Sequence, residues 1–70
     1  MTTRALEDAV EVAHTNQAWG VVLRDRGDAS GAAKRLELAA EGFKAAELPK
    51  QATEASALLR EAKKVVHAGA

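Results

Sequence analysis

The two histidines, His14 and His67, are the side chains best suited to act as acids or bases near neutral pH. As a catalytic base, an imidazole needs a nucleophile beside it and a third group that orients it. The serines and threonines of this chain are scattered, and none lies in a motif typical of a nucleophile. Both histidines are predicted on polar faces of helices, in contact with solvent. The sequence therefore predicts no catalytic residue, no small-molecule substrate and no enzyme activity.

Metal binding is the second chemistry that these residue types permit. The chain has no cysteine, and two histidines cannot complete a zinc site without carboxylates. Metal sites in helical bundles use inward-facing glutamates, with a histidine three residues further on. Two pairs of glutamates lie one helical turn apart, Glu7 with Glu11 and Glu37 with Glu41, and all four are predicted to face outward. We therefore expect no metal ion and no other cofactor.

The tripeptide Arg26-Gly27-Asp28 matches a sequence by which integrins recognise some extracellular proteins. A boundary between two helices accounts for all three residues. Arginine suits the negative end of a helix, glycine adopts the left-handed conformation that ends it, and aspartate caps the helix that follows. The tripeptide is therefore interpreted as a helix boundary and not as an adhesive site.

Length and charge limit the classes of partner. Seventy residues make one domain at most, here residues 1–70. Ten basic and ten acidic residues cancel, so the chain lacks the positive field that drives most binding to nucleic acids and anionic membranes. The longest apolar runs, such as residues 21–23, have three residues and are too short for a bilayer, and the first residues show no secretory signal pattern. We expect a cytoplasmic protein with no membrane contact.

Alanine makes up 17 of the apolar residues, which together are 47% of the chain. It is the best helix former and lets helix axes approach closely, but it buries little area. When residues are placed at 100° per position, as in a helix, three segments become amphipathic, about 3–26, 28–48 and 49–67. Gly27 ends the first segment, Asp28 or Ser30 caps the second, and Pro49 opens the third. We predict an all-α fold, a small bundle of three amphipathic helices.

The apolar faces of these segments differ in bulk. The second segment carries only Leu36 and Phe43 as large residues on an alanine stripe, with Leu38 and Ala45 in a minor second row. The third has the most regular face: Ala52, Ala55, Leu58, Leu59, Ala62, Val65 and Val66. The first has an arc of about 200°, which is wide enough for two edges. One edge carries Leu6, Val10, Ala13 and Val21, and the other carries Val12, Trp19 and Leu23.

Residues 16–44 resemble a tetratricopeptide repeat, a helical hairpin that stacks into peptide-binding arrays. The residues that match the family pattern are Trp19-Gly20, Leu23, Gly27-Asp28, Ala32, Leu36 and Ala39. Asn16 occupies the family's leading tryptophan position and Lys44 its closing proline position, so the match is partial. The resemblance implies a hairpin plus one extra helix, with ligands on the face of the first helix that presents His14, Gln17, Val21 and Arg24.

Trp19 suits either a core or an interface, since tryptophan serves as an anchor in both. An alanine-rich core of this size is thin, which makes the monomer marginally stable and favours a dimer through the Trp19 edge or the Leu38–Ala45 row. We therefore expect a protein–protein interaction module, or a small adaptor or regulatory subunit, that acts by helix packing and self-associates as a homodimer. Its expected contact residues are Trp19, Val12, Leu23, Val21, Arg24 and Leu38.

The alternative is a small regulator that binds nucleic acid through a helix-turn-helix. The turn at 26–30 has a suitable length for that motif. The helices are long for it, however, and the second one is rich in alanine and nearly neutral. Nucleic acid is therefore the less favoured partner.

Overall fold

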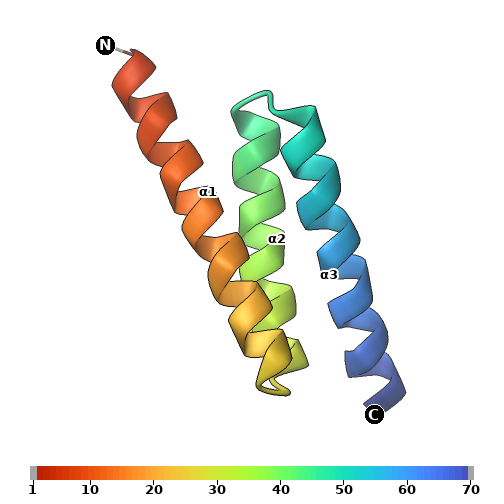
Figure 1. Cartoon of the computed structure of the whole chain (residues 1–70). Helices are drawn as coiled ribbons and strands as arrows, with labels where there is room; N and C mark the ends of the chain where they lie inside the picture. The colour runs from red at the N-terminus through yellow and green to blue at the C-terminus, as the bar shows by residue number, and fades with distance from the viewer. Residues whose placement is uncertain (1, 70) are drawn as a thin grey trace.

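The chain folds into three helices packed together, with no strand among the described residues. The structure is a computed structural model that describes the backbone of residues 2–69 and the side-chain surroundings of residues 7–66. The helices are α1 (Thr2–Asp25), α2 (Ala29–Ala45) and α3 (Pro49–Gly69), and each runs antiparallel to the one before it (Figure 1). The predicted all-α class is confirmed. Over residues 2–69, no helix is both long and apolar enough to cross a membrane.

The turn between α1 and α2 is built as its residue types predict. Gly27 has a φ of 90°, in the left-handed region. Its N–H donates to the carbonyl of Arg24 at 3.0 Å, and the N–H of Asp28 donates to the carbonyl of Leu23 at 2.8 Å, the two hydrogen bonds of a Schellman motif. The Asp28 carboxylate then accepts from the N–H of Gly31 at 2.9 Å. Asp28, rather than Ser30, is therefore the N-cap of α2.

The turn between α2 and α3 repeats the same motif without a glycine. Glu47 takes the left-handed position with a φ of 59°, and Leu48 donates to the carbonyl of Phe43 at 2.9 Å. The predicted end of α2 at Leu48 was wrong: the helix ends at Ala45, because Glu47 leaves the helical conformation and Leu48, as the residue before proline, is disfavoured in it. Pro49 opens α3 as predicted, and α3 continues to Gly69, two residues beyond the predicted end.

Helix α2 lies between α1 and α3 and makes nearly all of the contacts between helices (Figure 1). Two buried clusters follow its length. One surrounds Phe43 and contains alanines of all three helices, Ala13, Ala39, Ala52 and Ala55. The other surrounds Leu36, with Ala32 and Ala62 buried and Leu23, Leu58 and Leu59 packed against them. Phe43 and Leu36 are the largest side chains that are completely buried among those described, so the core is as thin as the alanine content predicts.

Two glycines bring α1 and α2 into close contact, one near each cluster. A methyl group at Gly20 would lie 2.7 Å from Cγ of Leu36, and one at Gly42 would lie 2.9 Å from Cβ of Ala13. Both distances are shorter than carbon atoms tolerate. The helix axes therefore approach at a spacing that only glycine permits at these two positions.

The predicted apolar faces are buried in part. On α2, Ala29, Ala32, Leu36, Ala39 and Phe43 are buried as expected. On α3, Val65 and Val66 are 56% and 37% exposed, so their predicted place in the core was wrong. Since α3 runs antiparallel to α2, they lie beside the first turn of α2, and beyond that turn no residue of α2 remains to cover them. Leu6 lies outside the residues whose side chains are described.

Candidate functional site

Trp19 stands out on the surface of α1 because it is exposed and yet held in place. Its side chain is 47% exposed, and the guanidinium carbon of Arg35, on α2, lies 3.7 Å from the centre of its ring. A guanidinium stacked on an indole is attracted by the negative face of the ring. Arg35 thus covers one side of Trp19 and leaves the rest of the ring to solvent.

Asn16 fixes the arginine that covers the tryptophan. Asn16 is 8% exposed and lies one turn before Trp19 on α1. Nη1 of Arg35 donates to Oδ1 of Asn16 at 3.3 Å, so the buried amide oxygen has a partner and the arginine has a second attachment. Sequence reasoning missed both Asn16 and Arg35. The only signal was a polar residue, Asn16, at helical spacing from Val12, Trp19 and Leu23.

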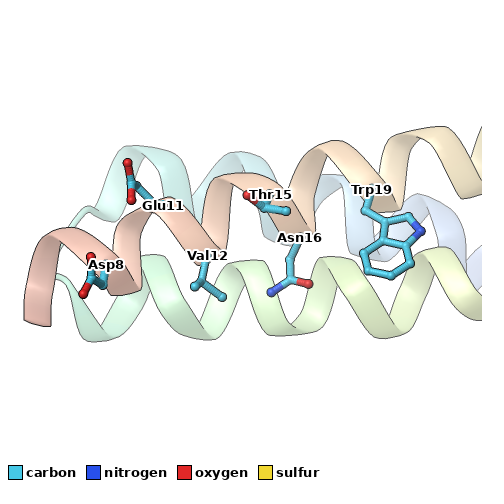
Figure 2. A pocket seen from close by; sticks show the side chains of 6 residues that line it. All are labelled: Asp8, Glu11, Val12, Thr15, Asn16 and Trp19. Atoms are coloured by element: carbon cyan, nitrogen blue, oxygen red, sulfur yellow. The ribbon is translucent and has the colours of Figure 1, made fainter.

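A shallow groove of about 400 Å³ runs along α1 beside this tryptophan. Its lining residues are Asp8, Glu11, Val12, Thr15, Asn16 and Trp19. Figure 2 shows them along successive turns of α1, with Val12 and Asn16 on the side where α2 runs and Glu11 pointing away from it. Val12 and Trp19 are the apolar residues of the groove, and the carboxylates of Asp8 and Glu11 lie at one end.

The predicted contact residues divide between two sides of α1. Val12 and Trp19 line the groove together, and Val12 is 59% exposed. Leu38 of α2 is 44% exposed and lies one turn beyond Arg35, so it borders the same face. Leu23 is only partly exposed because it packs against the cluster around Leu36.

Val21 and Arg24 lie on the other side of α1, where both are partly buried. Nη1 of Arg24 is 3.6 Å from Oε2 of Glu61 on α3, and Nη2 of Arg24 is 3.7 Å from Oδ1 of Asp25. Arg24 therefore connects the two outer helices. It lies away from the groove that holds Val12 and Trp19.

His14 does not line this groove. The ring of His14 meets the ring of Phe43 edge to face, with centroids 4.9 Å apart and planes at 76°. His14 is exposed as predicted, but it also shields the largest residue of the core. His67 lies outside the residues whose side chains are described. Within residues 7–66, no three histidine or acidic side chains lie close enough together to hold a metal ion.

Comparison with protein-family models, curated proteins and solved structures gives no match for this chain.

Proposed function

We propose that this protein is an interaction module that packs the exposed face of α1 against another protein subunit, and that the subunit is a second copy of the chain. The observation that carries the proposal is Trp19, half exposed and yet fixed by Arg35. Tryptophan and arginine are the residues most enriched among the energetically dominant positions of interfaces. A side chain already held in one conformation loses little entropy when a partner covers it.

The exposed apolar residues around Trp19 add to this argument. Val12, Trp19 and Val22 are each about half exposed along α1, and Leu38 borders them on α2. Complete burial of a large apolar side chain is worth roughly 1.5–3 kcal/mol, so covering the exposed halves of three contributes on the order of 2–4 kcal/mol per chain. The thin core makes such a contribution a large share of the total stability.

The face implied by the tetratricopeptide-repeat resemblance is less suited to a ligand. That face presents His14, Val21 and Arg24. His14 is engaged with Phe43, and Arg24 is engaged with Glu61 and Asp25. We therefore place the partner at Val12 and Trp19, on the other edge of α1, whether or not the hairpin is related to that family.

The helix-turn-helix alternative has less support. The two helices of that motif cross at about 90–120°, whereas α1 and α2 lie antiparallel and in contact along most of α2 (Figure 1). The protein also has no net charge. Binding to duplex DNA at low salt would revive this alternative.

Size-exclusion chromatography with light scattering tests the proposal. At high micromolar concentration we expect about twice the chain mass of 7.4 kDa, and Trp19→Ala should shift the equilibrium towards the monomer. Val65→Ala is the matched control, because Val65 is 56% exposed but lies on α3. A wild-type monomer at that concentration contradicts the proposal, as does an equal shift in both variants.

A further inference from the structure

Six exposed side chains, five on α1 and one directly after it, recur at alternating intervals of four and three residues. They are Asp8, Val12, Thr15, Trp19, Val22 and Arg26. This spacing is the a/d pattern of a coiled coil, which keeps one seam of a helix facing a partner helix. Arg26 follows the last residue of α1, but its N–H donates to the carbonyl of Val22 at 3.0 Å, so it keeps the helical register. We call these six residues the α1 seam.

The spacing of the α1 seam is the same from either end of the helix. Its intervals are four, three, four, three and four residues, and their midpoint along the helix is position 17. Two α1 helices laid antiparallel with that residue at the same level would therefore place every seam residue beside another. Val12 would lie beside Val22 of the second copy, and Thr15 beside its Trp19. The large indole would thus meet a small residue, as close packing requires.

The charges of the seam favour the same orientation. Asp8 stands at one end and Arg26 at the other, and both are exposed. In the antiparallel arrangement each aspartate faces an arginine, once at each end. In a parallel arrangement the two aspartates, the two arginines and the two indoles would each face their own copies, which costs electrostatic energy and crowds the centre.

We propose that two copies of this protein pair antiparallel along the α1 seam, about a two-fold axis that crosses the seam between Thr15 and Trp19, at the level of Gln17. The inference rests on the self-association proposed above and specifies its surface, orientation and register. An isologous contact of this kind closes on itself and produces a dimer, not a filament. Arg35 supports the contact from behind, since it holds the ring of Trp19 in place on α1.

Distances between two spin labels, one on each copy, test the orientation. The chain has no cysteine, so Ala18→Cys and Glu7→Cys each provide one labelling position, and both residues are exposed. At a rise of 1.5 Å per residue, labels at position 7 should lie about 30 Å apart along the axis and labels at position 18 only about 3 Å apart along it. The pair at position 18 should therefore be much the closer.

The outcomes separate the proposed self-association from the proposed antiparallel seam. A monomeric mass contradicts both. A dimer with both label pairs equally close is parallel, and a dimer with labels at position 18 far apart uses another surface. Either result overturns the antiparallel seam and leaves the self-association standing.

Exchange of the two end charges gives a second, independent test. Asp8→Arg alone places two arginines together at each end and should weaken the dimer roughly fivefold to thirtyfold, since exposed ion pairs are worth little individually. Arg26→Asp alone should weaken it similarly. The double variant Asp8→Arg/Arg26→Asp should recover the wild-type dissociation constant. Recovery supports the antiparallel register, and a double variant as weak as the single ones overturns it, provided that circular dichroism shows unchanged helix content.

Discussion

Replacing Glu47 by glycine should stabilise the fold. Glu47 holds the left-handed position of the turn between α2 and α3, with a φ of 59°. The equivalent position in the turn between α1 and α2 is Gly27, and both turns carry the two hydrogen bonds of a Schellman motif. In this conformation the Cβ of an L-residue comes too close to the following carbonyl oxygen, which raises the free energy of the folded state. Glycine has no Cβ and avoids this cost.

The magnitude follows from two opposing terms. The left-handed conformation costs a non-glycine residue about 1–2 kcal/mol. Glycine gives the unfolded chain more freedom, which costs about 0.4–1 kcal/mol. We expect Glu47→Gly to raise the free energy of unfolding by about 0.5–1 kcal/mol, or Tm by roughly 2–8 °C for a domain of this size. Gly27→Ala should lower the stability, because the new Cβ would meet the same conflict.

Thermal unfolding followed by circular dichroism measures this effect. All variants must be compared at one protein concentration, because the proposed self-association would make Tm depend on concentration. Glu41→Gly is the matched control: it makes the same chemical change at an exposed position inside α2, where glycine should lower the stability by about 1 kcal/mol. If Glu47→Gly lowers Tm as Glu41→Gly does, the reasoning from the left-handed position is wrong.

Three further substitutions test other parts of the fold. Gly20→Ala should lower the free energy of unfolding by about 1–3 kcal/mol, because its Cβ would lie 2.7 Å from Leu36; an unchanged urea midpoint would contradict the close helix approach. Asp28→Ala should cost about 1 kcal/mol through loss of the α2 cap, and thermal unfolding with no loss would place the cap elsewhere. Arg35→Ala should uncover the ring of Trp19, the only tryptophan, so acrylamide should quench its fluorescence more strongly; equal quenching would show that the arginine does not cover the ring in solution.

The ends of the helices could be predicted wherever one residue type decides them. Gly27, Asp28 and Pro49 each act through their own backbone or side-chain geometry, and the structure confirms all three. The end of α2 could not be predicted in this way. Glu47 carries no local preference for a left-handed conformation, and it adopts one because Pro49 forces the chain out of the helix and the turn must still satisfy its carbonyl groups.

The side chains of the groove were only partly predictable. The position of each residue around the helix axis separated Val12 and Trp19 from the opposite edge of α1. The structure places these two residues together at the groove. The position around the helix axis could not show that Leu23 packs inward against the cluster around Leu36. It also gave no hint that Asn16 and Arg35 meet, because their contact joins residues of two helices and depends on how those helices lie against each other.

The central position of α2 has a consequence for how the molecule opens. Since α1 and α3 touch each other so little, each can detach from α2 without disturbing the other, as outer repeats do in stacked helical arrays. Backbone amides of α2 should therefore exchange with deuterium last, near the rate set by global unfolding, and those of the outer helices earlier. Detachment of α1 would also carry Trp19 away from Arg35, so the self-association proposed above should be lost before the remaining hairpin unfolds.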